Sequence, residues 1–318
     1  MSPRVEFRLS QIEKNIKELQ ARCEGIYFAF PVKCCNEPKV LRLVSEMFMG
    51  FDVSNKNEYQ IIKQYDDGRL ICSSGPLSYE LNGVSNVLVA ANSMKRWDGK
   101  SGIRINFNSD ERFTDSHFGI DYLKLDKKVI DRVSYVHFHN SDHRNYEKCE
   151  CVLEHIYNII KKFNNLKILN IGGHLENLTF EEGVSYIQNV REIVPPKIKV
   201  IVEAGDFLFK EAGVLFCKVI DCYFDGKSQV VILDFSKMAN QRWVYPILCE
   251  DSMDMGGNRE SFDTVFYGCS CCEVDVFLQT SCKKYDVGEE VIFQNISPYS
   301  YQWNHQFNGI AGIEFYFV

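Results

Sequence analysis

The segment Ile26–Cys35, IYFAFPVKCC, decides how the rest of the chain is organised. It is an apolar run that ends in one lysine, Lys33, and the helix-favouring residues Asn36–Pro38 follow directly. Such a run is typical of a strand that is buried on both faces. Burial disfavours the charged form of an amine, so the sequence predicts a lowered pKa for Lys33 and a nucleophile able to form a Schiff base. For an isolated lysine, the commoner interpretation is a side chain that leaves the core for solvent.

Length and composition bound the class of protein. The chain has 318 residues, which is enough for two domains or for one barrel with an appended domain. Its net charge of −7 gives no reason to expect a nucleic acid or an anionic membrane as partner. We find neither an apolar run of about 18 residues nor a basic and apolar leader, so we expect no transmembrane helix and no signal peptide.

The cysteines indicate a reducing compartment. There are 13 of them, an odd count that includes the neighbours Cys34-Cys35 and Cys271-Cys272. Together with the missing export leader, this pattern favours reduced thiols and a cytoplasmic location. Cys269 and Cys272 form a CxxC and His137 and His139 form an HxH, but neither has zinc-finger or zinc-ribbon spacing, so no metal site is predicted.

Eight apolar or β-branched runs alternate with helical patterns in the first two thirds of the chain. The predicted strands are Ile26–Val32, Phe51–Val53, Leu70–Cys72, Val87–Ala90, Gly102–Phe107, Val133–Phe138, Ile168–Ile171 and Val200–Val202. The predicted helices between them are Pro38–Phe48, Glu58–Tyr65, Glu147–Phe163 and Phe180–Val194. This alternation predicts a closed parallel (β/α)8 barrel of the TIM type, shortened at Ala91–Ser101, where the chain is too short for a helix. An open doubly wound sheet is the alternative.

Beyond Glu203 the pattern changes to strands with turns between them. The predicted strands are Phe207–Ile220, Val230–Phe235, Thr264–Tyr267, Glu273–Thr280, Val287–Asn295 and Ile313–Val318. They predict an all-β C-terminal domain. We therefore expect a barrel domain at residues 9–205 and a β-sandwich or β-barrel domain at residues 206–318, joined by a strand from residues 1–8. The segment Asp251–Glu260 is the most loop-like, and it is a candidate gate for the site.

Ionisable residues and glycines fall at the carboxyl ends of the predicted barrel strands, where barrel enzymes carry out their chemistry. These residues are Lys33, Asp52, Arg104, His137, His139, Gly172, Gly173 and Glu203. A glycine-rich turn can bind a phosphate through its backbone N–H groups, and a carboxylate can keep a pyridine nitrogen protonated. A lysine can hold an aldehyde, and an imidazole can stack on a flat ring. The combination predicts a site for pyridoxal 5′-phosphate.

The motifs, taken in order, resemble those of the fold-type III pyridoxal-phosphate decarboxylases, a family that includes ornithine, diaminopimelate and carboxynorspermidine decarboxylases. The segments that carry the resemblance are FAFPVKCC (Phe28–Cys35), GFDVSNKNE (Gly50–Glu58), HFGI (His117–Ile120), VHFHNS (Val136–Ser141), NIGGH (Asn170–His174), VEAGD (Val202–Asp206), YGCSCCEVD (Tyr267–Asp275), SPYSY (Ser297–Tyr301) and FNGI (Phe307–Ile310). The resemblance implies an alanine-racemase-like barrel with a C-terminal β domain, and it runs closest to the carboxynorspermidine branch.

The resemblance also implies roles for single residues. Lys33 would bind the cofactor covalently, His139 would stack on its ring, Glu203 would contact the pyridine nitrogen, and Cys271 would be the catalytic cysteine. The other implied cofactor contacts are Asp52, Arg104, Ser141, Gly172, Gly173, Gly205 and, on the phosphate, Tyr299. Sites of this family form at a dimer interface, which implies a homodimer with shared active sites.

Three departures from the family pattern bear on cofactor and substrate. His174 stands at the third glycine of the phosphate loop, and Asp206 stands at the arginine after Glu-Pro-Gly. Cys272 stands where the amine-binding branches have an acid, so Glu273 and Asp275 are the candidate substrate-binding acids beside it. A carboxylate at the ring nitrogen favours decarboxylation over racemisation.

We therefore expect loss of the α-carboxylate from a substrate with a 3-amino-3-carboxypropyl group, as in carboxynorspermidine or a microcin C-type nucleotide-peptide intermediate. One alternative is an ornithine, lysine or diaminopimelate decarboxylase. The other is a non-catalytic binding protein that resembles the antizyme inhibitors.

Overall fold

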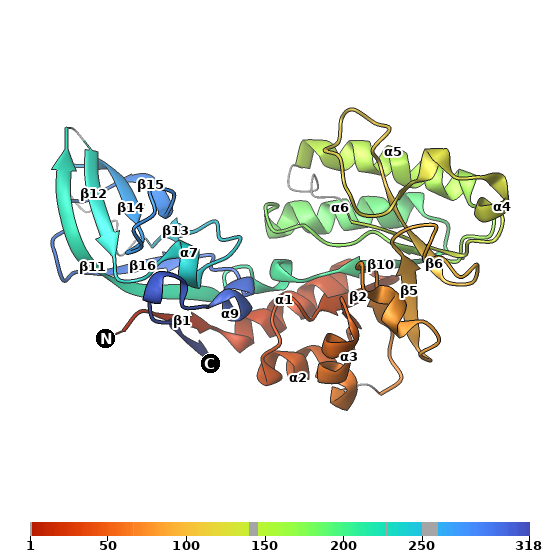
Figure 1. Cartoon of the computed structure of the whole chain (residues 1–318), viewed down its shortest axis with the longest axis horizontal. Coiled ribbons are helices and arrows are strands. Elements are labelled where there is room, and N and C mark those ends of the chain that lie inside the picture. Colours follow the sequence, from red (N-terminus) through yellow and green to blue (C-terminus); the bar gives the residue numbers. More distant parts are fainter. Residues whose placement is uncertain (1, 66, 140–145, 227, 250–259) are drawn as a thin grey trace. The chain divides into compact units, whose positions relative to one another are not determined.

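The computed structural model describes residues 2–65, 67–139, 146–226, 228–249 and 260–318 (Figure 1). The chain forms two compact units, one made of Lys14–Leu208 and the other of Met1–Glu13 with Phe209–Val318. The domain limits predicted above, residues 9–205 and residues 206–318 with 1–8, stay a prediction.

Eight parallel strands of the first unit close into a barrel, as the sequence predicts. In chain order they are β2 (Ile26–Pro31), β3 (Gly50–Asp52), β4 (Ile71–Ser73), β5 (Val87–Ala91), β6 (Gly102–Asn106), β8 (Tyr135–Phe138), β9 (Ile168–Asn170) and β10 (Lys199–Glu203). Each strand pairs with the next, and β10 pairs with β2, with Val202 opposite Phe28. This closure excludes the open sheet. A two-residue strand that the sequence analysis missed, β7 (Ile120–Asp121), pairs with β6.

Small and branched side chains fill the barrel interior. Ala29, Cys72 and Ile201 come from three different strands and form one fully buried cluster. Every residue of β3, β4 and β8 is buried, and so are the last four residues of β2. Near-continuous burial explains why these strands read as unbroken apolar runs instead of alternating ones.

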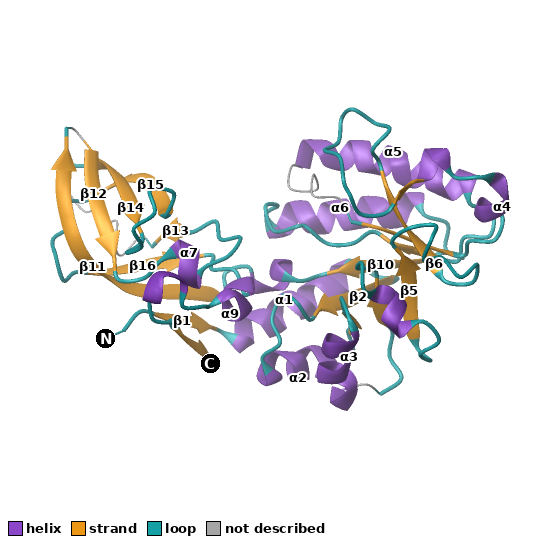
Figure 2. Ribbon diagram, viewed as in Figure 1, coloured by secondary structure: helices purple, strands orange, loops and turns teal. Residues whose placement is uncertain are grey.

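Helices cover the outside of the barrel strands (Figure 2). The longer ones are α1 (Leu9–Arg22), α2 (Pro38–Glu46), α3 (Lys56–Ile62), α5 (Tyr146–Lys162) and α6 (Phe180–Ile193). Shorter elements are η1 (Lys63–Tyr65), η2 (Ser78–Leu81), η3 (Tyr122–Lys124) and α4 (Lys127–Ile130). The four predicted helices agree with α2, α3 with η1, α5 and α6 to within two residues at each end. Between β5 and β6 there is no helix, as the short connection requires.

Side-chain caps fix the starts of two helices close to the barrel mouth. The Asn55 side chain accepts hydrogen bonds from the backbone of Asn57 and Glu58 at the start of α3. Thr179 and Glu182 form a reciprocal capping box at the start of α6. Each cap satisfies N–H groups that have no partner inside the helix, and it sets where the preceding loop ends.

The second unit is built on β strands. They are β1 (Arg4–Phe7), β11 (Gly213–Asp225), β12 (Ser228–Leu233), β13 (Ile247–Leu248), β14 (Phe262–Tyr267), β15 (Val276–Cys282), β16 (Glu290–Gln294) and β17 (Glu314–Phe317). Short helical segments lie between them: α7 (Lys237–Asn240), α9 (Tyr299–Trp303) and η6 (Phe307–Gly309). β1 pairs with both β11 and β17, so the two ends of the chain lie in one sheet. Phe266, Phe277 and Phe293 pack edge to face in the core.

The predicted strand Phe207–Ile220 is wrong at its start, because Asp206–Phe209 form the 3-10 turn η5 and β11 begins at Gly213. The apolar residues Phe207, Leu208 and Phe209 are buried inside that turn, which is why they resemble a strand. The candidate gate at 251–260 lies outside the described residues, except for Glu260.

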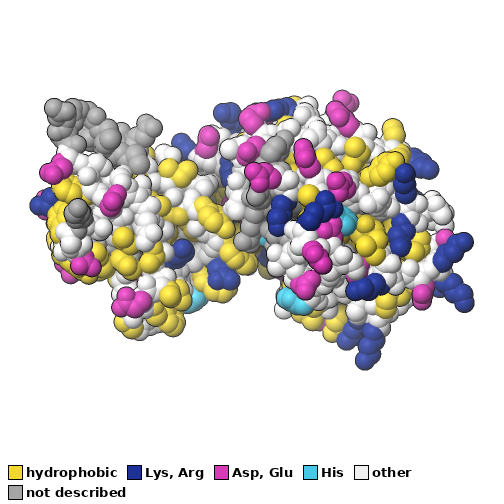
Figure 3. All heavy atoms as spheres, turned by 90° about the horizontal axis from the view of Figure 1, so that it is seen from above, with side chains coloured by type: hydrophobic (Ala, Val, Ile, Leu, Met, Phe, Trp, Pro, Cys, Tyr) yellow, Lys and Arg dark blue, Asp and Glu magenta, His cyan; other side chains and the backbone are white. Residues whose placement is uncertain are grey.

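The surface carries charges of both signs. Acidic and basic side chains intermix over the face of the first unit drawn in Figure 3, in agreement with a modest net charge of −7. Among the described helices, none is long and apolar enough to cross a membrane.

Candidate active site

Lys33 lies directly beyond the end of β2, in a tight turn. The Val32 N–H donates to the backbone oxygen of Asp52 at 2.9 Å, and the Cys34 N–H donates to that of Pro31 at 2.9 Å. The Lys33 side chain is 41% exposed, and its Nζ lies 3.6 Å from Oδ2 of the buried Asp52 at the end of β3. The turn therefore presents the amine at the barrel mouth and not inside the strand.

The predicted lowering of the Lys33 pKa is wrong. Burial does lower it, but the carboxylates of Asp52 and Glu203 outweigh burial, and the pKa of Lys33 is raised. Asp52 shows the converse effect, because burial and the charge of Glu203 raise its pKa to about 8. An ammonium and an acid that titrates near neutrality therefore lie side by side, and Asp52 is positioned to take the proton that Lys33 must lose before it attacks an aldehyde.

Glu203 ends β10 inside the barrel mouth and is buried. Its Oε1 accepts a hydrogen bond from Asn170 Nδ2 at 3.0 Å and lies 3.1 Å from His137 Nε2. Burial alone would raise the pKa of this carboxyl. The contacts with His137 and His139 and the charge of Lys33 reverse that effect and hold the pKa of Glu203 well below its usual value. The group is therefore a buried carboxylate that stays ionised.

His139 follows β8 and faces the same carboxylate. Its Nδ1 lies 3.7 Å from Glu203 Oε2 and accepts a hydrogen bond from the Gly173 N–H at 3.3 Å. Burial lowers the pKa of His139 to about 3, so the imidazole is neutral and can accept that bond. The site thus offers a flat, uncharged ring beside an anion.

The glycine-rich turn after β9 packs tightly against these groups. Gly172 has φ +70°, and a Cβ on Gly173 would clash with the backbone oxygen of Glu203. His174, which stands at the third glycine of the motif, also has a positive φ of 71°, a conformation that glycine adopts without strain. Its Nδ1 pairs with Glu176 Oε1 at 2.6 Å.

Arg104 lies on β6 and is buried, and burial lowers its pKa. It donates to the backbone oxygen of Ser74 at 3.3 Å, and its guanidinium lies 4.7 Å from the centre of the Phe118 ring. A cavity of about 240 Å³ opens beside it at the ends of β6 and β8. Arg104, Phe118, Phe138 and His139 are among the residues that line this cavity.

The remaining predicted residues of this unit are Gly205 and Ser141. The Gly205 N–H donates to the backbone oxygen of Glu203 at 3.1 Å, so it shapes the turn that follows the carboxylate. Ser141 lies outside the described residues. The barrel unit therefore brings Lys33, Asp52, His139 and the Gly172–Gly173 turn around Glu203, with Arg104 close enough for its charge to act on that carboxylate.

The other predicted residues belong to the second unit. Cys271 is exposed, and its Sγ accepts a hydrogen bond from Asn308 Nδ2 at 3.2 Å. Cys272 is half-buried and Glu273 is exposed. Tyr299 begins α9, and its ring meets that of Trp243 edge to face at 4.8 Å.

The expected substrate contact of Asp275 is wrong. The residue is fully buried, and its carboxylate accepts hydrogen bonds from the Ser236 hydroxyl at 2.7 Å and from the N–H groups of Met238 and Ser270 at 3.2 Å. A Cβ on Gly268 would clash with it. Asp275 therefore organises the turn that carries Cys271, and it offers no oxygen to a substrate.

The sequence analysis placed His137 at a strand end but gave it no role, and it missed Asn170. Both are fully buried and both contact Glu203. The HxH spacing contained the necessary information, because residues two apart on a strand point to the same face, so His137 accompanies His139 into the barrel. Among the described residues, no group of three or more His, Cys, Asp or Glu side chains could hold a metal ion, and the thirteen cysteines are thiols outside any disulfide.

The residues at the barrel mouth fit pyridoxal 5′-phosphate. Lys33 would supply the amine for its aldehyde and Glu203 the ionised partner for its ring nitrogen, and a Cβ at Gly172 or Gly173 would clash with the neighbouring backbone. The buried Asp52 Oδ1 has no hydrogen-bond partner among the described residues, as expected where a bound polar group completes a site.

Comparisons with known proteins agree. Residues 9–68 match the pyridoxal-binding domain of the pyridoxal-dependent decarboxylases. Ornithine decarboxylase 2 of Drosophila melanogaster is 23% identical over an alignment of 348 positions, which covers 95% of this chain and 88% of that protein.

Solved structures share the fold. The Paramecium bursaria Chlorella virus arginine decarboxylase bound to agmatine has a TM-score of 0.82 at 18% identity, over 100% of this chain and 97% of that one. The Campylobacter jejuni carboxynorspermidine decarboxylase complexed with norspermidine has a TM-score of 0.71 at 20% identity, over 98% and 92%. With the closed barrel, these likenesses show that the chain has the fold of the pyridoxal-dependent decarboxylases, and residues 9–68 match the pyridoxal-binding domain of that family.

Proposed function

We propose that the protein removes the α-carboxylate from a substrate whose amine and carboxylate end a 3-amino-3-carboxypropyl group. The observation that carries the proposal is the placement of Lys33, paired with Asp52 at 3.6 Å, at the same barrel mouth as the ionised Glu203, whose charge acts on Lys33 together with that of Asp52. A carboxylate in this place favours decarboxylation because it can keep a pyridine nitrogen protonated.

Pyridoxal 5′-phosphate, when bound, supplies the electron sink that accepts the electron pair of the breaking bond between Cα and the carboxylate. Lys33 would hold the cofactor aldehyde through its Nζ, and Asp52, whose Oδ2 lies 3.6 Å from that nitrogen, would exchange a proton with it. The raised pKa of Asp52, about 8, suits this exchange near neutral pH.

Glu203 and His139 orient the ring. Glu203, which stays ionised, would hold a proton on the pyridine nitrogen, and the neutral His139 imidazole would stack on the ring without adding charge. On the second unit, the Cys271 thiol delivers a proton to Cα once CO₂ has left. Its exposure and its hydrogen bond from Asn308 support this role.

The substrate proposal rests on the residue after Cys271. Cys272 is not acidic, and of the two acids near it Asp275 is buried and fully engaged. Only Glu273, which is exposed, is left in this segment to meet a distal ammonium. A substrate with a simple terminal ammonium, such as ornithine, is therefore less favoured than one with a larger distal group.

Decarboxylation assays test the proposal directly. We expect CO₂ release from carboxynorspermidine or from an aminocarboxypropyl nucleotide at a higher kcat/KM than from ornithine, lysine or diaminopimelate. Turnover of ornithine alone would overturn the substrate assignment and leave the decarboxylase assignment in place.

We further propose a homodimer in which Cys271 of one chain serves the Lys33 site of the other. Family resemblance supports this arrangement, in which each site needs both protomers. The exposure of Cys271 is compatible with it.

One observation favours a second candidate, a non-catalytic binding protein. Cys34, next to Lys33, has its pKa raised mainly by burial but also by the charges of Asp206 and Glu176. Negative charge close to the expected phosphate turn disfavours an anionic cofactor. An absorbance spectrum separates the two functions. A long-wavelength band that borohydride abolishes supports the enzyme, and a protein that stays colourless with added pyridoxal 5′-phosphate supports the binding protein.

A further inference from the structure

His137 makes a contact that no motif assigns. It lies on β8, fully buried, and its Nε2 is 3.1 Å from Glu203 Oε1. Asn170 on β9 donates to the same oxygen at 3.0 Å. Two side chains from two neighbouring strands thus converge on one oxygen of a single carboxylate, while Oε2 faces His139 at 3.7 Å.

The other ring nitrogen of His137 identifies its tautomer. His137 Nδ1 is buried and has no hydrogen-bond partner among the described residues. A buried N–H without an acceptor is rarer and costlier than a bare acceptor, so the proton belongs on Nε2, where it is donated to Glu203. Protonation of both ring nitrogens would also place a proton on Nδ1, where it would be a buried N–H without a partner among the described residues. Burial lowers the pKa of His137 and outweighs the charge and hydrogen bond of Glu203, which raise it; the positive charges of Arg104 and Lys33 act in the same direction as burial.

A neutral donor has a specific consequence for Glu203. It stabilises the carboxylate over the carboxylic acid, as any hydrogen bond to the charged form does. It does so without adding a positive charge that would compete with a pyridinium for the same anion. Because His137 and Asn170 both engage Oε1, the carboxylate cannot rotate freely, and Oε2 is the oxygen that remains for a ligand.

We propose that His137 is a positioning residue: with Asn170 it holds Glu203 ionised and turned so that Oε2 meets the ring nitrogen of the cofactor. This inference rests on the proposed function. The inference goes beyond the proposed function because it makes the protonation state of the cofactor ring depend on a residue that does not touch the cofactor. His139, two residues further along, lies at the mouth, while His137 acts from below through Glu203.

The test compares two substitutions of similar length in the full-length protein. His137→Gln keeps an N–H donor for Glu203, and His137→Met fills the space without one. Each variant is loaded with pyridoxal 5′-phosphate. We measure the amount of borohydride-reducible linkage to Lys33, the absorbance spectrum between pH 6 and pH 9, and kcat and KM.

We expect both variants to form the reducible linkage as wild type does. In His137→Met the protonated-ring band should be lost at a lower pH than in wild type, and kcat should fall at least tenfold with little change in KM. His137→Gln should restore most of both properties. In a Glu203→Gln background the His137→Met substitution should have no further effect on the spectrum, because the two residues act as one unit.

Several outcomes would overturn the inference. One is a wild-type spectrum and kcat in His137→Met. Another is equal loss in the Met and Gln variants, which is the result for a packing role alone. If the Met variant does not fold, a folded Gln variant without the protonated-ring band also overturns it. Failure of the proposed function is distinct, because wild type itself would then form no linkage to Lys33.

Discussion

At the scale of single residues, Asp52 is an acid in an unusual environment. Its side chain is buried, Oδ1 has no hydrogen-bond partner among the described residues, and burial with the charge of Glu203 raises its pKa to about 8. An acid whose pKa is raised in the folded protein contributes stability that is fully present below its unfolded pKa, about 4. That contribution is lost as the pH rises through about 8.

Asp52→Asn should therefore change the pH dependence of stability. We expect the cofactor-free variant to be more stable than wild type at pH 9, by about 1–3 kcal/mol, and this difference to be smaller at pH 7 and smaller again at pH 5, because it disappears only below the unfolded pKa of about 4. Urea unfolding at pH 5, 7 and 9 measures this difference. Asp131→Asn, an exposed aspartate of the same unit, is the matched control. A stability difference that does not vary with pH would contradict the assignment.

Residue types and spacing placed Lys33, His139 and Glu203 at the ends of barrel strands, and the structure brings these three side chains together at one barrel mouth. Their roles stay predictions. The direction of the Lys33 pKa shift could not be predicted, because it depends on two acids from other strands, whose distances a sequence does not contain. Asp275 was misjudged for the same reason, since nothing in its spacing reveals that Ser236 and Met238 enclose it.

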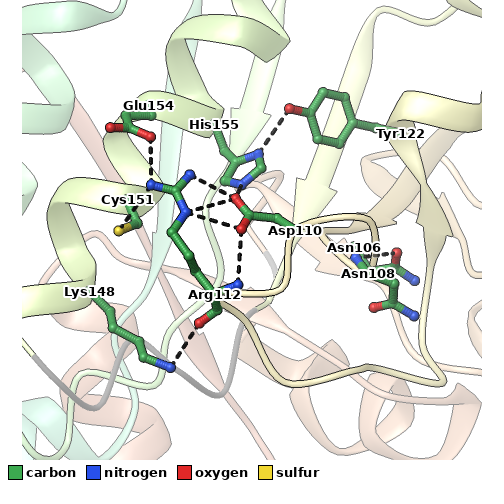
Figure 4. Close-up of polar contacts among 9 residues, drawn as sticks. All are labelled: Asn106, Asn108, Asp110, Arg112, Tyr122, Lys148, Cys151, Glu154 and His155. Atoms are coloured by element: carbon green, nitrogen blue, oxygen red, sulfur yellow. Dashed lines mark hydrogen bonds and ion pairs between the residues drawn. The ribbon is translucent and has the colours of Figure 1, made fainter.

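At the scale of elements, periodicity located the strands and the long helices but not the connections. One such connection is the segment 107–119 between β6 and β7, which we call the arm (Figure 4). Asp110 pairs there with Arg112 at 2.7 Å and with Nε2 of His155 on α5 at 2.9 Å. His155 Nδ1 meets the Tyr122 hydroxyl at 2.9 Å, and its ring stacks on Phe107 at 4.1 Å. The sequence shows none of this, because the partners are up to 45 residues apart.

The buried part of this cluster should matter more than its exposed part. His155→Leu keeps the packing against Phe107 but removes two hydrogen bonds, and we expect a loss of about 1–3 kcal/mol in the free energy of unfolding. Arg112→Gln removes ion pairs of a side chain that is 47% exposed, and it should cost less than about 1 kcal/mol. Urea unfolding of both variants measures the difference. A larger loss in Arg112→Gln would show that the surface pairs, and not His155, hold the arm to α5.

At the scale of the whole molecule, the order of the chain explains why the second unit uses both ends. β1 pairs with β11 in antiparallel fashion and with β17 in parallel fashion, with Arg4 opposite Phe216 and Glu314. The barrel sequence is thus inserted between the first strand of this sheet and the rest. Alternating β and α patterns predicted the barrel, and a strand from residues 1–8 was expected in this domain, but its pairing with β11 and β17 is non-local and no local pattern specifies it.

The proposed sharing of each active site between two protomers can be tested with mixed dimers. Lys33→Ala and Cys271→Ala should each be inactive, because the first removes the aldehyde-binding amine and the second the proton donor. If each site combines Lys33 of one chain with Cys271 of the other, a mixed dimer holds one doubly altered site and one intact site. Random mixing of equal amounts after dissociation should then recover about a quarter of the wild-type CO₂ release per chain, because half the dimers are mixed and each has one intact site. Mixing Lys33→Ala with Lys33→Met serves as the control and should recover nothing. Mixed dimers that are demonstrably formed yet inactive would mean that each chain builds its site alone.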